Sequence, residues 1–177
     1  MPLRHTNDTY ISNHIFMERE HNYKLSLKWN GNTGNGTSDY RAYERAYSIH
    51  ITNKPDLDGS SDPTFRGDKT KHNPEDMLIA ALSSCHMLSY LHVCATGGVI
   101  VVDYSDHATG LMVTTSDGAG HFTEVVLNPI VIVADASMIE KANEYHKKAS
   151  ELCFIANSVN FPVKHNPVTL PPPSSAG

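Results

Sequence analysis

The segment from His72 to Gly98, HNPEDMLIAALSSCHMLSYLHVCATGG, constrains the fold most, because it predicts one long helix. Asn73 is a good N-cap, Pro74 suits the first helical position, and Glu75 favours the positive end of the helix dipole. The closing glycine pair supplies a stop signal. At roughly 24 residues, this helix is long enough to lie at the centre of a small domain.

One face of this helix is predicted to be buried, and it carries a cysteine. The residues with the required spacing of three or four are Leu78, Ala81, Cys85, Leu88 and His92, and the face is widened by Ala80, Leu82, Met87 and Leu91. We therefore expect the thiol of Cys85 to lie in or beside the core.

A second helix is predicted from Ser137 to about Asn157 and Ser158, where Ser137 and Glu140 form a capping-box pattern. Its expected buried stripe consists of Ile139, Ala142, His146, Ala149, Leu152 or Cys153, and Ala156. Cys153 would then lie within a helix and face the interior, as Cys85 does.

The remaining periodic segments predict strands. Residues 23–29 and 40–51 alternate apolar and polar side chains, and further strands are expected over 98–106, 109–118, 122–135 and 160–168, with Pro129 marking a kink or an edge position. The order ββ–α–βββ–α–β predicts an α+β fold in which two long helices pack on sheet.

The chain divides into three parts. Residues 1–21 are polar and aperiodic and predict a loose arm, residues 22–170 predict a single domain, and residues 171–177 form a Pro/Ser-rich tail. Within the domain, residues 53–73 form a long aperiodic connection, which is typical of functional or mobile loops.

Composition excludes several classes of function. With 14 basic and 19 acidic residues the net charge is -5, which argues against nucleic-acid or anionic-membrane partners. The 11 histidines are spread along the chain and fit surface and loop positions better than a metal site. The N-terminus lacks the apolar core of a signal peptide, and no apolar run reaches the length of a membrane span, so we expect a cytoplasmic protein.

The three cysteines are too few for a disulfide scaffold. Cys85 and Cys153 each lie on a predicted inner face rich in small residues, so the two helices could approach closely enough for a disulfide. Two interpretations stay open: the cysteines pack as small apolar residues, or they form a redox pair. Cys94 is read as a core residue.

A reactive buried thiol requires a fixed positive partner, because apolar burial alone raises its pKa. Arg45 shares a predicted strand face with large apolar residues, so it either extends to water or faces an anion. Glu75 could hold the guanidinium, but it precedes Cys85 by ten residues, about 15 Å along a straight helix. Either the loop and first helical turn bend back toward Cys85, or Glu75 serves the site of a second subunit. We favour the second interpretation, a dimer with sites at the interface.

Three segments carry a resemblance to a known family. NPEDMLIAALSSC, KKASELCFIANSV and KWNGNTGNGTSDYRAYERAYSIHI resemble the two cysteine helices and the amino-terminal hairpin of the OsmC/Ohr family, the osmotically induced and organic hydroperoxide resistance proteins, and in particular its OsmC-like subgroup. The resemblance spans about Tyr23 to Val168 in the family's order.

The resemblance implies an intertwined homodimer with two central helices packed on antiparallel sheets. It implies thiol-dependent reduction of organic hydroperoxides, with an external dithiol of the lipoyl type as reductant and with no metal or organic cofactor. Cys85 would be the peroxidatic thiol, Cys153 the resolving thiol and Glu75 the carboxylate that positions the arginine. That arginine would be Arg45. Arg66 is its competitor and Arg41 a distant third.

The chain departs from the family at two positions, since His86 follows the first cysteine where many members have an aromatic residue, and Phe154 follows the second where many have proline. Two alternatives to a peroxidase remain. One is a non-enzymatic stress or binding protein with structural cysteines. The other is a hydrolase that uses Cys85 with His146. This alternative is disfavoured because the backbone N–H groups around a mid-helix cysteine are already hydrogen-bonded and cannot form an oxyanion hole.

Overall fold

The computed structural model describes residues 19–173 and confirms the α+β fold. Most of the predicted arm, 1–21, and the end of the predicted tail lie outside the described residues. The helices and strands, in chain order, are β1 (Ser26–Trp29), β2 (Tyr47–His50), β3 (Leu57–Gly59), α1 (Pro74–Gly97), β4 (Val101–Asp106), β5 (Thr109–Thr114), β6 (Gly120–Leu127), β7 (Pro129–Val133), α2 (Ile139–Leu152), β8 (Val163–His165) and β9 (Val168–Leu170). Three short 3₁₀ turns complete them: η1 (Pro63–Phe65), η2 (Ala136–Met138) and η3 (Ala156–Ser158).

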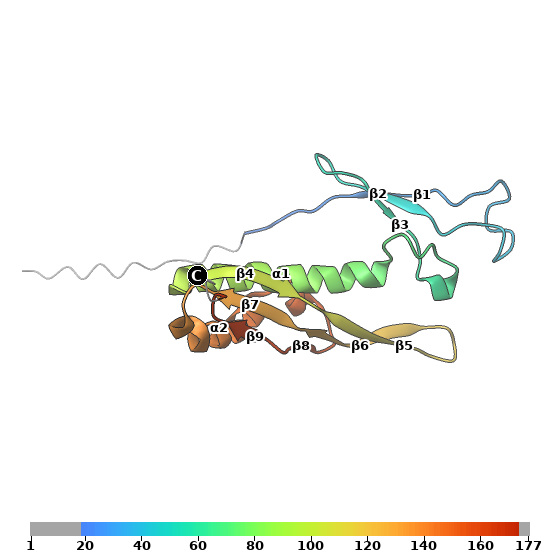
Figure 1. The fold of residues 1–177 in the computed structure, drawn as a ribbon. Coiled ribbons are helices and arrows are strands. Elements are labelled where there is room, and N and C mark those ends of the chain that lie inside the picture. The colour runs from blue at the N-terminus through green and yellow to red at the C-terminus, as the bar shows by residue number, and fades with distance from the viewer. Residues whose placement is uncertain (1–18, 174–177) are drawn as a thin grey trace, which may run out of the picture.

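The strands form three small sheets. The orders are β1-β2-β3, β4-β7-β9 and β5-β6-β8. β8 pairs with β6, and β9 with β7, in parallel, so two sheets are mixed rather than purely antiparallel. Figure 1 shows β4 to β9 running alongside α1, while the N-terminal sheet lies apart from them, near the N-terminal end of α1.

Both predicted ends of α1 are confirmed. The Asn73 side chain accepts a hydrogen bond from the Asp76 amide at 2.7 Å, and Pro74 begins the helix. Gly98 adopts the left-handed conformation, φ 76°, and its N–H donates to the Cys94 carbonyl. These local signals fix the helix bounds because each satisfies backbone groups that a helix end leaves free.

The predicted buried face of α1 is wrong by one position. The buried residues are Leu82, His86, Tyr90, Val93 and Cys94. Leu88, expected inside, is 63% exposed in the single chain, and Cys85 is half-buried. α1 is apolar on all sides, so periodicity cannot select its buried face. By length and composition α1 even meets the criterion for a membrane span, which the sequence reading had excluded and which core helices of soluble proteins also meet.

α2 differs from prediction at both ends. η2 precedes it, and the Asp135 side chain accepts the Ser137 amide, so the expected Ser137–Glu140 capping box does not form. The helix ends at Leu152, and Cys153 follows in an extended conformation instead of lying within the helix. The buried stripe is confirmed at Ala142, His146, Ala149 and Cys153.

Two predicted strands are each divided in two. Residues 122–135 break at Asn128 into β6 and β7, with Pro129 at the first position of β7, which confirms the expected kink. Residues 160–168 become β8 and β9.

The core has two parts, which lie on successive segments of α1. One cluster contains Leu82, Val125 and Leu127, and the other contains Tyr90, Cys94, Val99, Val131, Val133, Ala142 and Ala149. Both clusters draw on the strands that run alongside α1, and neither includes a residue of the N-terminal sheet. α1 therefore serves as the central element that carries Cys85.

Candidate functional site

The structure brings Cys85 and Cys153 together. Cys85 lies in the middle of α1 and is half-buried, whereas Cys153 directly follows α2 and is 1% exposed. The Cys85 thiol lies near enough to influence the pKa of Cys153, and both are free cysteines. A partly exposed thiol beside a buried one is an arrangement from which a disulfide can form.

The environment of Cys153 keeps it protonated at neutral pH. Burial, followed by the neighbouring Cys85 thiol, raises the pKa of the Cys153 thiol to about 11. The Ala156 N–H, which points at the sulfur from 3.5 Å, acts in the opposite direction. Cys153 is therefore a thiol at rest, and a solute reaches Cys85 first.

Exposed apolar side chains lie close to both cysteines in the sequence. Leu152 and Phe154 flank Cys153 in sequence, and Phe154 is 78% exposed. The Ser89 hydroxyl lies 3.5 Å from the Leu152 carbonyl and so links α1 to the end of α2 beside the pair. Leu88, three residues after Cys85 in α1, adds a further exposed apolar side chain.

Glu75 lies in the first turn of α1, under the N-terminal sheet. One of its carboxylate oxygens is buried and has no hydrogen-bond partner among the described residues. The Tyr47 phenol lies close to this carboxylate. Burial of the phenol, followed by the negative charge of Glu75, raises the pKa of Tyr47. Tyr47 in turn packs over Gly59, where a Cβ would come within 2.2 Å of the ring.

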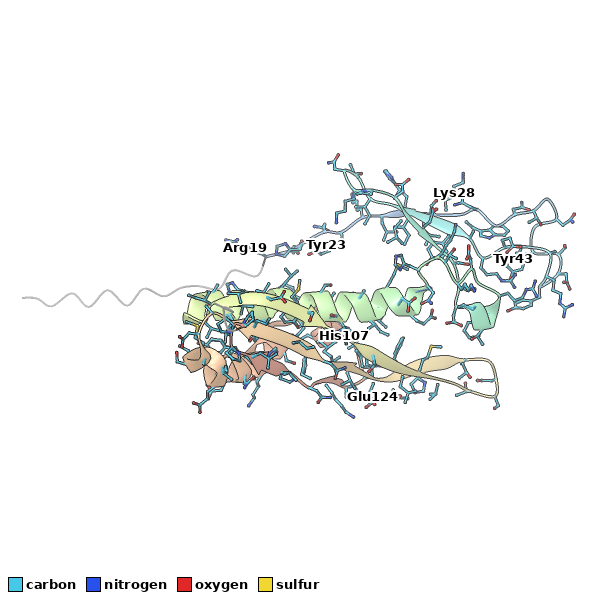
Figure 2. The ribbon with its side chains drawn as sticks, in the orientation of Figure 1. Arg19, Tyr23, Lys28, Tyr43, His107 and Glu124 are labelled. Carbon is cyan, nitrogen blue, oxygen red and sulfur yellow. The ribbon has the colours of Figure 1, made fainter. Side chains whose placement is uncertain are left out.

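Arg45 is held within its own loop. Its guanidinium donates to the Tyr40 carbonyl at 2.7 Å and to the Tyr43 carbonyl, and its Cζ atom lies 4.4 and 4.2 Å from the centres of the two rings. Figure 2 places Tyr43 in the N-terminal part of the chain, beyond the N-terminal end of α1. Within one chain, the structure therefore leaves Arg45 away from Cys85.

The other candidate arginines are exposed. Arg66 ends η1 in the left-handed conformation, φ 66°, and Arg41 lies in the loop before β2. Over residues 19–173, no arginine forms an ion pair with a carboxylate. The identity of the site arginine stays a prediction.

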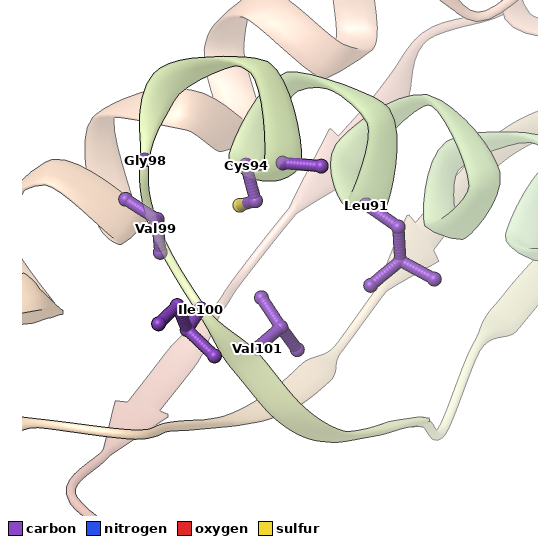
Figure 3. Close-up of a pocket in the computed structure, with 7 residues that line it drawn as sticks. Leu91, Cys94, Gly98, Val99, Ile100 and Val101 are labelled. Atoms are coloured by element: carbon purple, nitrogen blue, oxygen red, sulfur yellow. The ribbon is translucent and has the colours of Figure 1, made fainter.

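Cys94 is confirmed as a core residue. It lies on the floor of an apolar cavity of about 290 Å³ at the C-terminal end of α1, together with Leu91, Val99 and Val101 (Figure 3). Burial raises the pKa of its thiol. Nine residues along α1 separate Cys94 from Cys85, about 13 Å, so the cavity is distinct from the thiol pair.

Two histidines that composition had assigned to the surface lie inside, and a third, His165, is half-buried beside them. His86 is fully buried and His146 nearly so, and the ring centre of His165 lies 4.2 Å from that of His86. We call these three residues the histidine cluster. Sequence reasoning placed His146 on a buried stripe but missed His86, because its face of α1 was misassigned. Within the described part of the chain, no group of His, Cys, Asp or Glu has the arrangement of a metal site.

The contacts of His146 count against the hydrolase alternative. Its Nδ1 atom lies 3.1 Å from His86 Nε2, so this nitrogen is engaged with another imidazole rather than with the Cys85 thiol. The ring also stacks on Tyr90 at 4.0 Å. A general base must reach the nucleophile it activates, and His146 makes other contacts instead.

Comparisons with known proteins agree with this fold. Residues 67–167 match the family model described as OsmC-like protein. The uncharacterized protein YmaD of Bacillus subtilis is 24% identical over 143 residues, which cover 79% of this chain and 87% of that protein.

Solved structures are similar over most of the chain. An OsmC-like protein of unknown function from Vibrio cholerae is 29% identical with a TM-score of 0.76, and the match covers 84% of this chain and 100% of that chain. An organic hydroperoxide resistance protein from Elizabethkingia anophelis shares the fold, with a TM-score of 0.61 at 16% identity over 85% of this chain and 98% of that chain. Since the family model matches more than half of its length, the chain belongs to the OsmC-like family, some members of which confer resistance to organic hydroperoxides.

Proposed function

We propose that the protein is a thiol-dependent peroxidase that reduces organic hydroperoxides to alcohols. The observation that carries the proposal is the proximity of the half-buried thiol of Cys85 to the buried thiol of Cys153. The exposed apolar side chains close to these cysteines in the sequence, Leu88, Leu152 and Phe154, suit an organic substituent on the peroxide.

The chemistry proceeds in three balanced steps. The Cys85 thiolate attacks the distal oxygen of ROOH, the O–O bond breaks, and the alkoxide takes a proton to leave as ROH while Cys85 becomes a sulfenic acid. The Cys153 thiol then displaces water from the sulfenic acid and forms a disulfide. An external dithiol of the lipoyl type reduces this disulfide by thiol exchange and is itself oxidised to a cyclic disulfide.

A second copy of the chain would complete the site. Glu75 has a buried, unpartnered carboxylate oxygen, which is costly unless a cation approaches it. The N-terminal sheet leaves large apolar side chains exposed, including Leu27 at 60% and Trp29 at 40%. In the proposed homodimer, the N-terminal sheet of one copy covers α1 of the other, and Arg45 or Arg66 with Glu75 serves Cys85 across the interface.

The proposal predicts that one equivalent of cumene hydroperoxide consumes two thiols per chain. Attack by Cys85 and closure by Cys153 account for both, and the buried Cys94 is spared. In Cys153→Ser the two-thiol loss is abolished, because the sulfenic acid at Cys85 has no partner thiol. Free thiols are counted with a chromogenic disulfide under denaturing conditions, before and after peroxide.

Cys94→Ala is the matched control for this titration, and it must still lose two thiols. If the wild-type protein loses none, the cysteines are structural, and the family fold here serves a non-enzymatic stress or binding role.

Subunit complementation tests the shared site. Cys85→Ser and Arg45→Ala are each expected to be inactive, whereas a refolded equimolar mixture should regain about a quarter of the wild-type activity, because half of its dimers are mixed and each of these has one intact site. Peroxide-dependent oxidation of dihydrolipoamide measures the recovery. If Arg45→Ala is fully active while Arg66→Ala is inactive and complements, Arg66 is the site arginine; no recovery with either would place the arginine within the same chain.

A further inference from the structure

The histidine cluster is joined to the thiol pair by the packing of α1 on α2. The two helices run antiparallel, and several polar and thiol groups lie between them. From the C-terminal end of α1, these pairs are Gly97–Tyr145, Tyr90–Ala142, Ser89–Leu152, His86–His146 and Cys85–Cys153. The histidine pair therefore neighbours the cysteine pair along the helix interface.

The His86–His146 contact differs in kind from the others. Within the described residues, it is the one hydrogen bond that joins a side chain of α1 to a side chain of α2, with 3.1 Å between Nε2 and Nδ1. Both rings are buried, and they lie nearly parallel, at 12°. Their outer nitrogens, His86 Nδ1 and His146 Nε2, have no hydrogen-bond partner among residues 19–173.

Stability alone does not account for this pair. Replacing both partners of a buried hydrogen bond by apolar groups of similar shape is close to neutral, whereas two unpartnered buried nitrogens carry a desolvation penalty. A hydrogen bond does supply a preferred distance and direction, which apolar contact lacks. The pair is thus suited to fixing the separation of two helices.

We propose that the His86–His146 hydrogen bond positions α1 and α2 for closure of the Cys85–Cys153 disulfide. The inference rests on the function proposed above. His86 is the next residue to Cys85 in a rigid helix, so any movement of His86 relative to α2 moves the Cys85 sulfur as well. A disulfide tolerates only about 4.4–6.8 Å between its Cα atoms, so a small change in helix separation weakens it. His86 and His146 are positioning residues here, not catalytic ones.

Redox equilibration against glutathione tests this positioning role without using a peroxide. In the wild-type protein we expect the Cys85–Cys153 disulfide to form at equilibrium. In His146→Leu the equilibrium constant for the disulfide should fall about tenfold or more, a shift of about 30 mV in its potential. In His146→Asn, which retains a polar atom close to the position of Nδ1, it should stay within about threefold of wild type.

Two further variants keep the test decisive. His86→Leu/His146→Leu replaces both partners and is expected to unfold close to the wild-type temperature while showing the weakened disulfide, which separates positioning from stability. His121→Leu changes an exposed histidine of β6 and should leave the constant unaltered.

An unaltered constant in His146→Leu, or an equal loss in His146→Leu and His146→Asn, would overturn the inference, since the second result would assign the effect to ring packing. If the wild-type protein forms no disulfide, the proposed function fails and this inference fails with it.

Discussion

Replacing Cys85 by serine is expected to lower peroxide-dependent oxidation of dihydrolipoamide by roughly 10³-fold or more, since a hydroxyl is a far weaker nucleophile than a thiolate. The assay is steady-state turnover with cumene hydroperoxide. Cys85 is the thiol that solutes reach, because Cys153 is buried and its pKa is raised to about 11. Cys153 therefore cannot substitute for it at neutral pH.

Cys153→Ser separates the two thiol roles. We expect this variant to complete the first reduction and then to accumulate a sulfenic acid at Cys85, which dimedone traps and excess peroxide oxidises further. Cys94→Ala should retain activity within about threefold of wild type, because Cys94 lies in a separate apolar cavity. A Cys85→Ser protein that kept more than a tenth of the activity would contradict the assignment.

Local signals made the bounds of α1 predictable. Asn73, Pro74 and Gly98 act through backbone hydrogen bonds within a few residues, so the sequence contains all that is needed. The end of α2 was not predictable in this way. No glycine or proline immediately follows Leu152. The helix stops because Cys153 adopts an extended conformation and enters the core. The residue at which α2 ends therefore depends on the packing of α1 against α2.

The candidate site was also predictable only in part. Small residues on both helices indicated that Cys85 and Cys153 could meet, and the structure places the two thiols near each other. The arginine could not be assigned, because strand alternation places Arg45 on a face but cannot say which chain that face covers. In the described chain the guanidinium contacts Tyr40 and Tyr43 instead.

The histidine cluster shows a different limit of sequence reasoning. Histidine is polar, so a scattered set suggests surface positions, and only the packing reveals stacked imidazoles in the core. The signal that could have found them is spacing: His86 lies four residues from Leu82 and four from Tyr90, on the face that is buried. The consequence of this burial is measurable in the dependence of stability on pH.

Lowering the pH from 7 to 5 is expected to reduce the free energy of unfolding by about 2–4 kcal/mol. Burial, followed by the neighbouring imidazoles, lowers the pKa of His86 to about 3 and that of His146 to about 4, and burial also lowers the pKa of His165. In the unfolded chain these histidines titrate near pH 6.5. Between about pH 6.5 and 4, the unfolded state therefore binds more protons than the native state, so stability falls as the pH falls.

The groups around the histidine cluster do not reverse the expected fall in stability at lower pH. Tyr90 and Tyr104 stay neutral because burial raises their pKa values, and Asp106 opposes the shift of His165 without cancelling it. Urea unfolding at pH 7, 6 and 5, at one protein concentration, measures the slope. In His86→Leu/His146→Leu most of the slope should disappear, whereas His121→Leu should retain it. The same slope in the double variant as in the wild type would assign the pH dependence to other groups, since the paired imidazoles would then titrate normally in the native state.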